Sequence, residues 1–565
     1  MLLDFLQLGI ALALLYLLVF PVGRYLAAVF TGRPTWIDRI IDPLDNAIYR
    51  LAGVDRRVQQ RWRAYFVAML VTNAVMFAML FVTLELQQVL PLNPDGAGPV
   101  NVFLAFNTAA SFITNTNWQN YAGENTLSYF SQLFAIIFPQ FTSAATGLAC
   151  GAAFIRGLAG NRELGNFYVD VTRITTRILL PIAFVAAIAF VALGVPATFA
   201  GAAQASTLDG AQQTITRGPI AALESIKHLG TNGGGWFNTN SAHPFEDPSP
   251  LSNILELVLM AILPMGLVYA FGVMTNRMRQ AWTFFWVMSA FFVGFLIVAY
   301  VGEVYGNPLL NALGLNSAQG NMEGHEVRFG QALTALFVTA TTAFTTGTVN
   351  AMHDSLTPLA SITPLAQMML NMVFGGKGVG LINLAIFVIL AVFLTGLMVG
   401  RTPEFLGKKI EAHEVKLAAA AFLMHPLLIL GSMAMTLALS LDLGSIFNPG
   451  SHGFSELLYM FTSEAANNGS AFGGITGNTN WFNTSGGIVM LLGRYVSIAL
   501  MLALAGSLAA KKATPVTVGT MRTDDRLFGG VLAGTVLIIG ALTFFPTLAL
   551  GPIAEHLAML SGKAF

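Results

Sequence analysis

Long apolar stretches separated by short polar connections follow one another through the whole chain. A helix crosses a bilayer with about twenty apolar residues. Ten stretches reach that length, at about 3–29, 64–86, 129–155, 174–197, 251–275, 281–301, 362–400, 416–441, 485–510 and 527–550. The seventh is too long for one simple helix and contains the glycine-rich break Phe374–Gly380. The pattern predicts an all-α polytopic membrane protein with ten transmembrane helices.

Four shorter apolar segments lie between these spans, near 102–113, 219–230, 330–344 and 454–466. At 12 to 15 residues they are too short to cross a membrane, and this length is typical of re-entrant half-helices. Each segment leads directly into a polar string rich in Thr, Asn and Gly. The strings are Thr114-Asn115-Thr116-Asn117, Thr231-Asn232-Gly233-Gly234-Gly235, Thr345-Thr346-Gly347-Thr348 and Asn467-Asn468-Gly469-Ser470, numbered 1 to 4 below.

The four strings recur at a nearly constant period. Aligning their third residues gives positions 116, 233, 347 and 469, and therefore intervals of 117, 114 and 122 residues. This repetition predicts four helix–pore-loop–helix repeats between a first and a last helix. The expected boundaries are 1–30 for the first helix, 64–155, 174–275, 281–400 and 416–510 for the repeats, and 527–550 for the last helix. Such repeats can surround one pseudo-fourfold ion pore.

The composition of the strings indicates the chemistry of that pore. Irregular backbone at membrane depth is tolerated only where it lines a cavity or packs in protein. Glycine permits the φ angles that inward-facing carbonyls need, and Thr or Asn side chains can hold such turns. Neutral dipoles favour K⁺ over Mg²⁺ or Ca²⁺, which prefer carboxylates. String 1 contains no glycine, so the ring is predicted to be unequal. A single string could instead be a loop that caps a helix, but four in register favour a filter.

Basic residues predict the orientation of the chain. Arg and Lys concentrate in five alternate connections, around 33–63, 156–173, 277–279, 401–416 and 511–526. With ten spans these connections share one face, which the positive-inside rule makes cytoplasmic. Both termini and all four strings are then extracytoplasmic. The N-terminus lacks the basic region of a signal peptide, so the first span is interpreted as retained.

Overall composition narrows the possible functions. The chain is 55% hydrophobic and 10% charged, whereas soluble proteins carry about 25% charged residues. Its net charge of zero argues against a nucleic-acid partner. Cys150 is the only cysteine, so an intrachain disulfide is excluded and a packing role is expected. The chain has neither a phosphate-binding P-loop nor an Asp-Lys-Thr-Gly phosphorylation motif, so we expect no ATP site in it.

Four sequence segments resemble the KdpA family, the potassium-binding subunits of the Kdp potassium-transporting ATPases. They are Thr114–Tyr121, Thr231–Asn238, Gly400–Lys409 and Asn467–Phe472, and the resemblance extends over essentially the whole chain. The family belongs to a superfamily of four-pore-loop potassium transporters. The resemblance implies that strings 1 to 4 select extracytoplasmic K⁺, the transported ion. It also implies transfer of the ion to a P-type ATPase subunit for ATP-driven import.

The resemblance implies partners and further site residues as well. The partners are a P-type ATPase catalytic subunit, a single-span accessory subunit and a small hydrophobic peptide, in the lipid of the bacterial plasma (inner) membrane. This chain would be a non-catalytic, ion-translocating subunit. Gly375, Gly376 and Gly378 would form a gating loop below the filter, and Arg494 a positive barrier to ion passage. A simple helix kink and a snorkelling or paired arginine are the alternatives, and the roles of Lys377 and Glu464 stay open.

The main alternative function is a stand-alone, gradient-driven potassium channel or symporter of the same superfamily. An inverted-repeat transporter is disfavoured because all four short segments enter from one side. Several polar residues receive less specific expectations. Gln119 and Asn120 either line the outer entrance or cap a helix, metal binding by His353-Asp354 is disfavoured, and Glu246-Asp247 and Asp524-Asp525 are interpreted as solvated loop charges.

Overall fold

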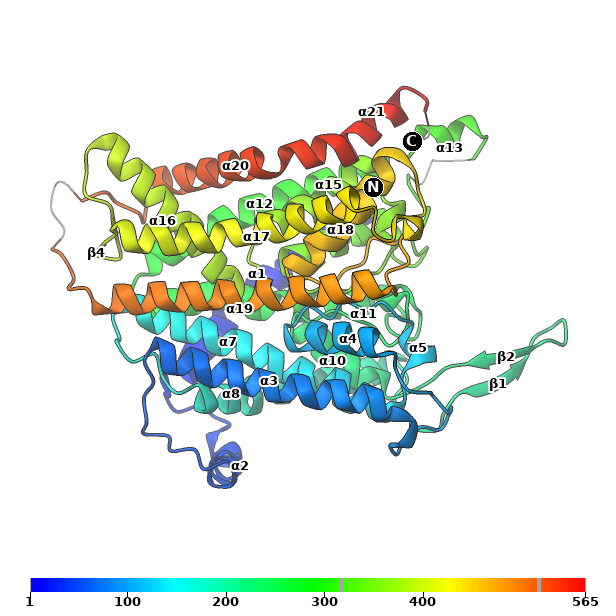
Figure 1. Cartoon of the computed structure of the whole chain (residues 1–565), viewed down its shortest axis with the longest axis horizontal. Coiled ribbons are helices and arrows are strands. Elements are labelled where there is room, and N and C mark those ends of the chain that lie inside the picture. Colours follow the sequence, from blue (N-terminus) through cyan, green and yellow to red (C-terminus); the bar gives the residue numbers. More distant parts are fainter. Residues whose placement is uncertain (1, 316–319, 516–519, 564–565) are drawn as a thin grey trace.

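The computed structural model describes residues 2–315, 320–515 and 520–563. Within these ranges ten helical segments are long and apolar enough to cross a membrane, which confirms the predicted all-α polytopic fold. They lie side by side along the long axis of the molecule (Figure 1). The segments are α1 (Leu2–Thr31), α3 (Trp62–Leu86), α6–η2–α7 (Tyr129–Leu158), α8–η3–α9 (Phe167–Ala192), α11 (Pro250–Thr275), α12 (Met278–Tyr305), α16 (Val379–Val399), α17 (Ala412–Ala438), α19 (Asn480–Ala510) and α20–η7–α21 (Arg526–Leu560).

The long seventh stretch divides into two helices, α15 (Pro358–Leu370) and α16. The eight residues between them, 371–378, are not helical. The interruption is therefore a break in the helix, here called the break, and more than a kink. Asn371 ends α15 in the left-handed conformation, and Phe374, Gly375 and Gly378 also have positive φ angles. Left-handed residues cannot continue a right-handed helix, which explains why the helix stops here.

The four short apolar segments form the helices α4 (Val102–Ile113), α10 (Ile220–Leu229), α14 (Gly330–Ala343) and α18 (Gly450–Ala465). Each one ends where a polar string begins, as the sequence predicts. Asn101 caps the start of α4 by accepting a hydrogen bond from the backbone N–H of Phe103. All four helices are mostly buried, so their apolar residues pack against the surrounding spans instead of facing lipid.

The two ends of the helix bundle carry different structures (Figure 1). The start of α1, the end of α21 and the antiparallel hairpin β1–β2 (Ala203–Ser206 and Gln212–Ile215) lie at one end. The hairpin β3–β4 (Glu404–Phe405 and Lys408–Lys409) lies at the other end, and the amphipathic helix α2 (Asp38–Leu51) lies below the half of the bundle nearer to that end. This second end also holds the Arg-rich first connection. Helix α2 and both hairpins were not expected from the hydropathy pattern.

Two of these elements are attached to the bundle by basic side chains. Arg177, buried in the fourth span, pairs with Asp38, Asp42 and Asp45 along one side of α2. Lys408, in the hairpin that follows α16, donates to the carbonyl oxygens of residues 157 and 158 at 3.2 and 3.0 Å. A cation at the last carbonyls of α7 also complements the negative end of the helix dipole. The Gly400–Lys409 segment therefore attaches the connection that follows α16 to the end of α7.

The remaining elements are short connections between these helices. They are η1 (Gln87–Val89), α5 (Gly123–Thr126), η4 (Asn240–Ala242), α13 (Pro308–Ala312), η5 (His353–Ser355) and η6 (Leu443–Ser445). Asp525 caps α20 by accepting a hydrogen bond from the backbone N–H of Phe528, and Asp524 pairs with Arg522. These two acids are thus partly exposed loop and cap residues.

Candidate functional site

The backbone of each string begins in the same way. The N–H groups of Thr116, Asn232, Thr346 and Asn468 donate to carbonyl oxygens five residues earlier in their own short helices, at 2.8 to 2.9 Å. These four residues are therefore structurally equivalent. The alignment of third residues needs a correction in string 1, where the equivalent of Gly233 is Asn117 and not Thr116. The shift arises because α4 is followed by one residue, Thr114, that has the place of Gly230 after α10.

This correction explains how string 1 manages without glycine. The φ angles of Asn117, Gly233, Gly347 and Gly469 are 58°, 76°, 92° and 96°. Left-handed backbone is open to glycine, and asparagine enters it more readily than most other residues. The four strings are therefore more alike in backbone than their sequences suggest. They still differ in side chain, because only string 1 carries a Cβ at this position.

The strings contact one another in a closed ring. A Cβ on Gly233 would overlap the carbonyl oxygen of Thr346 in string 3, and one on Gly347 would overlap that of Asn468 in string 4. A Cβ on Gly469 would overlap the carbonyl oxygen of Thr116 in string 1. The ring closes between strings 1 and 2, where the Asn115 amide donates to the Thr231 carbonyl oxygen at 2.8 Å. Side chains are excluded from these contacts because backbone meets backbone there.

A cavity of about 580 Å³ lies at one opening of the ring. Its wall is built by residues that follow each of the four strings, such as Gln119, Asn238, Met352 and Gly473. Gln119 also accepts from the N–H of Gly235 at 2.8 Å and donates to its carbonyl oxygen at 3.1 Å. Residues 119 and 120 therefore both line this vestibule and brace neighbouring loops, since the Asn120 amide donates to residue 483.

The break at 371–378 lies at the other opening of the ring. A Cβ on Gly376 would lie 3.5 Å from the Thr345 Cβ and 3.8 Å from the Thr231 hydroxyl oxygen. The Asn371 side chain accepts from the Thr345 hydroxyl at 3.3 Å and donates to the Ala466 carbonyl oxygen at 3.3 Å. The first residues of the strings thus face the break, and the last residues lead to the vestibule. Of the predicted gating glycines, Gly376 lies beside this second opening, which is called the inner opening below, whereas Gly375 packs against Gly380 and Gly378 against Gly147.

Two buried cations accompany the break. The Lys377 ammonium donates to the Asn115 side-chain oxygen at 2.8 Å and to the Thr231 hydroxyl at 3.2 Å. Arg494, in the middle of α19, is 6% exposed. A Cβ on Gly147 of α7 would lie 2.8 Å from the Arg494 guanidinium and 2.7 Å from the Lys377 carbonyl oxygen. Arg494 therefore reaches the break instead of snorkelling, and within the described ranges it has no ion-pair partner.

The pair Glu246-Asp247 is fully buried, so its interpretation as solvated loop charge was wrong. Asp247 accepts from the Ser252 hydroxyl and the Asn253 amide at 2.5 and 2.7 Å, near the start of α11. Glu246 pairs with Lys227 of α10 at 2.6 Å. The sequence did contain a signal for this partnership, because a lysine in a short apolar helix needs a buried acid.

Lys227 is the centre of a polar network behind string 2. Its ammonium pairs with Glu224 at 2.9 Å and with Glu246, and it donates to Asn240 and Ser241 at 2.9 and 3.0 Å. Every one of these residues is at least nine-tenths buried. The Lys227 carbonyl oxygen accepts the hydrogen bond that starts string 2. The network therefore fixes both the backbone that enters the string and the loop that follows it.

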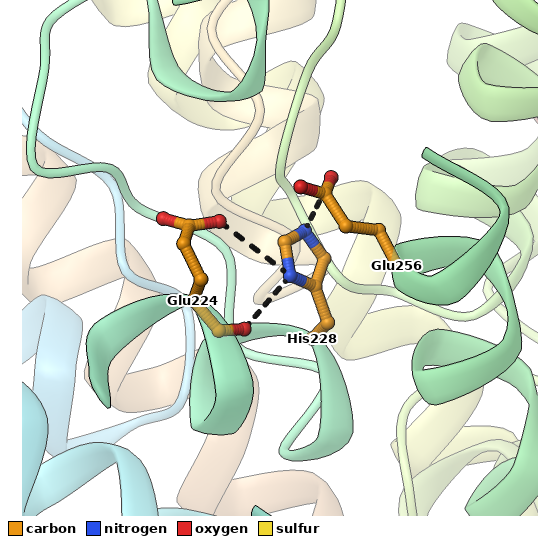
Figure 2. A group of neighbouring side chains, drawn as sticks. All are labelled: Glu224, His228 and Glu256. Carbon is orange, nitrogen blue, oxygen red and sulfur yellow. Dashed lines mark hydrogen bonds and ion pairs between the residues drawn. The ribbon is translucent and has the colours of Figure 1, made fainter. Parts of the chain in front are cut away.

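Glu224, His228 and Glu256 form a second part of this network (Figure 2). The Nδ1 of His228 is 2.9 Å from the Glu224 carbonyl oxygen, and its Nε2 is 3.0 Å from the Glu256 carboxylate. Figure 2 shows the two carboxylates facing different nitrogens of the ring. One metal ion could not bind both nitrogens of the same imidazole at bonding distance. These residues therefore form a buried polar cluster in which the two carboxylates lie beside different nitrogens of one imidazole.

A comparable group lies beside the vestibule. His452 of α18 is 2.9 Å from the Asp354 carboxylate through Nε2 and 2.8 Å from that of Glu555 through Nδ1. Burial alone would lower the pKa of His452, but its bonds to these two carboxylates outweigh that effect and raise the pKa to about 10. The ring is then a charged imidazolium with both nitrogens occupied. His353 is turned away from Asp354 and is 2.7 Å from the Tyr459 hydroxyl.

Glu464 precedes string 4 but packs against α19. A Cβ on Gly486 of that helix would overlap its carboxylate, which is fully buried. Its backbone carbonyl accepts from the N–H of Asn467, so the residue contacts the string through its backbone. Cys150 is buried in α7 beside Met69, in agreement with a packing role.

Four re-entrant helices, a closed ring of four pore loops and ten spans define a polytopic membrane protein of the four-pore-loop transporter class. The sequence model of the KdpA family, described as "Potassium-transporting ATPase A subunit", matches residues 9–557. The chain therefore belongs to the KdpA family.

Curated relatives agree with this assignment. The chain is 55% identical over 542 residues to the potassium-transporting ATPase potassium-binding subunit of Alicyclobacillus acidocaldarius, covering 95% of this chain and 96% of that one. It is 50% identical over 565 residues to the subunit of the same name from Mesorhizobium japonicum, covering 100% and 99%. Among solved structures, the potassium transporter TrkH from Vibrio parahaemolyticus is similar with a TM-score of 0.54 and 15% identity. The match covers 89% of this chain and 98% of TrkH, and it shows a shared fold.

Proposed function

We propose that the ring of strings 1 to 4 binds and selects extracytoplasmic K⁺. In this proposal the chain passes the ion to a partner P-type ATPase subunit for ATP-driven import. The closure of the ring is the observation that carries the proposal, because each string contacts the next one and strings from all four repeats take part. The names of the curated relatives, potassium-binding subunits of a potassium-transporting ATPase, support the choice of ion.

The electrostatics of the short helices support a cation at this centre. All four helices end at the ring, so four helix C-termini point toward it. Each C-terminus carries about half a negative charge. The strings themselves are neutral, since they contain only Thr, Asn, Gly and Ser. A monovalent ion with a weakly held water shell fits such dipoles, whereas divalent ions need carboxylates.

The four predicted repeats give this site its place in the membrane. Residues 64–155, 174–275, 281–400 and 416–510 each contribute one short helix and one string, and the outer helices flank them. We place the vestibule and both termini outside the bacterial plasma membrane, since the Arg-rich connections lie at the opposite end. Ions then arrive from outside. The break with Gly375, Gly376 and Gly378, together with Arg494, acts as the barrier on the cytoplasmic side.

The energy for import comes from another polypeptide in this proposal. The sequence has neither a P-loop nor a phosphorylation motif, and the relatives are named as subunits of an ATPase. We propose that the partners are the P-type ATPase subunit, a single-span accessory subunit and a small hydrophobic peptide. The alternative is a stand-alone channel or symporter. ATP-independent uptake by this chain alone, at the rate of the complex, would favour that alternative.

Substitution at the ring tests the binding site. We expect Gly347→Asp or Gly233→Asp to lower K⁺ affinity at least about tenfold, because each places a side chain where backbone carbonyls now meet. Gly53→Asp is the matched control. Gly53 also has a positive φ angle, but nothing lies within 4 Å of its Cβ position.

Ion-dependent stability provides the measurement. Bound ions stabilise the folded state, so K⁺ and Rb⁺ should raise the melting temperature of the wild-type complex with increasing concentration, and Na⁺ should not. The ring variants should insert into the membrane and lose this response, whereas Gly53→Asp should keep it. Unchanged K⁺ affinity and Rb⁺/Na⁺ discrimination in the purified ring variants would refute the proposal.

A further inference from the structure

Lys377 lies at the centre of the glycine-rich break, between Gly376 and Gly378. Its side chain extends to the inner opening of the ring, where Asn115 and Thr231 are the first left-handed residues of strings 1 and 2. The side chain is 1% exposed. The Asn115 side-chain oxygen also accepts from the Ser143 hydroxyl at 2.9 Å, and the Asn115 amide nitrogen donates to the Thr231 carbonyl oxygen. The ammonium is thus bound by two oxygens of the strings, the Asn115 side-chain oxygen and the Thr231 hydroxyl.

The charge of Lys377 is not neutralised nearby. In the part of the chain that the structure describes, no carboxylate lies within 4.0 Å of its ammonium. A charged neighbour is Arg494, which is also positive and approaches Gly147 of α7, as Lys377 does. Burying an unpaired ion costs several kcal/mol, so an ionised Lys377 depends on the neutral oxygens and helix C-termini around it. Both α4 and α10 end beside it.

The ligands of the ammonium are neutral oxygens, as the ligands of K⁺ in a carbonyl filter are. A hydroxyl and an amide oxygen at the inner end of two strings replace its water, and an ammonium group carries the same single charge as K⁺. We propose that the Lys377 ammonium is a tethered cation that occupies the innermost ion position of the ring and keeps the exit closed until it is displaced. This inference rests on the proposed function of the ring as a K⁺ filter.

The backbone around Lys377 leaves the side chain as the part that can move. A Cβ on Gly378 would overlap the carbonyl oxygen of Gly147, so the break is wedged against α7. The lysine side chain has four rotatable bonds and can swing without moving this backbone. An ion that enters from the vestibule is repelled by the ammonium at short range. Withdrawal of the side chain would then open the lowest position and let the ion leave the ring.

Two substitutions separate the charge of Lys377 from its packing. Lys377→Met keeps most of the length of the side chain and removes the ammonium, whereas Lys377→Arg keeps the charge. In the purified complex with its partner subunits, we expect Lys377→Met to bind Rb⁺ about tenfold more tightly than the wild type and to bind one more Rb⁺ at saturation. Lys377→Arg should bind Rb⁺ as the wild type does. Selectivity over Na⁺ should be retained in both, since the ring is untouched.

Equal Rb⁺ affinity and stoichiometry in wild type and Lys377→Met would overturn the inference. A lysine that only braces the break would give this result, or would make both variants unstable to the same extent. The wild type supplies a test that needs no variant, because Rb⁺ density between Asn115 and Thr231 in a high-resolution structure would also overturn it. Gly347→Asp separates the two proposals. If it leaves Rb⁺ binding intact, the filter proposal fails; if it abolishes binding while Lys377→Met changes nothing, only the tethered cation fails.

Discussion

Lys227 and Lys377 are both buried beside string 2, but their surroundings differ. Lys227 lies behind the string with two carboxylates within 3 Å, Glu224 and Glu246. Lys377 lies at the inner opening with only neutral oxygens, and its charged neighbour is Arg494. The two lysines are therefore buried to a similar extent, but only the Lys227 ammonium is paired with carboxylates.

Under the proposed function, the difference separates charges that hold the ring together from a charge that lies at the opening through which the ion would leave. A buried ion pair cancels most of its own field and holds two segments together. An unpaired buried charge acts on other ions over several ångströms, because the low dielectric of the interior weakens screening. The network of Lys227 is therefore structural, and the charge of Lys377 is available to act on a cation. Substitutions of the two lysines test whether this distinction is correct.

Lys227→Met should have the largest effect on stability. It would leave Glu224 and Glu246 buried without their cation and would free the loop held by Asn240. Removal of one partner from a buried ion pair costs about 3–5 kcal/mol. We expect a strong loss of folded complex and a large drop in melting temperature, measured by fluorescence-detected size exclusion at increasing temperature.

Lys377→Met is the matched control for this experiment, since it is the same substitution at an equally buried lysine. No carboxylate is left behind in the described surroundings of Lys377, so stability should stay close to that of the wild type or increase. Equal destabilisation by the two variants would show that both lysines are structural and would remove the distinction.

His452 extends the comparison to the vestibule, where a buried cation is again neutralised. His452→Gln would remove the charge that joins Asp354 to Glu555 and should cost about 2 kcal/mol, the usual range for hydrogen bonds to charged groups. The effect should depend on pH. The folded pKa of about 10 lies above the unfolded value of about 6.5, so the contribution is complete below pH 6.5 and disappears as the pH approaches 10.

Melting curves of wild type and His452→Gln across this interval test the prediction. The two proteins should differ most near pH 6.5, and the difference should shrink through pH 9. A difference that is constant with pH would mean that His452 contributes by packing, for example against Phe472, and not by its charge.

The sequence predicted those features that depend on local chemistry. Spans and short helices follow from hydropathy, which each segment carries by itself, and all four strings lie where they were expected. The register of string 1 was missed because it depends on which residue ends α4, and that residue differs by one from its counterparts. The φ angle of Asn117 then has the role that glycine has in the other strings.

The buried charges could be predicted only in part, because their partners are distant in sequence. Lys377 contacts Asn115, which lies 262 positions away, and Lys227 contacts Glu246, which lies 19 positions away across a loop. The one local signal is Glu224, three positions before Lys227 on the same helix, and Lys377 has no acidic residue at that spacing. Because its partner is distant in sequence, Glu246 looked like a loop charge. Hydropathy shows that burying a charged residue costs free energy. Only the fold shows which group is close enough to compensate its charge.

Among these variants, Glu256→Gln should have the smallest effect on stability. It tests whether the charges around Lys227 are purely structural. The network gathers three carboxyl groups, those of Glu224, Glu246 and Glu256, around Lys227 and His228, and Glu256 contacts the His228 Nε2 instead of the Lys227 ammonium. Glutamine keeps the shape of Glu256 and can still hydrogen-bond to His228, and the remaining carboxylates keep their cation. We therefore expect a change in the free energy of unfolding of no more than about 1 kcal/mol, and an unchanged Rb⁺ affinity. Glu246→Gln is the control, since it removes a direct partner of Lys227 and should cost more. A tenfold change in Rb⁺ affinity in Glu256→Gln would show that the network around Lys227 also acts on the ion. The charges behind string 2 could then no longer be called purely structural.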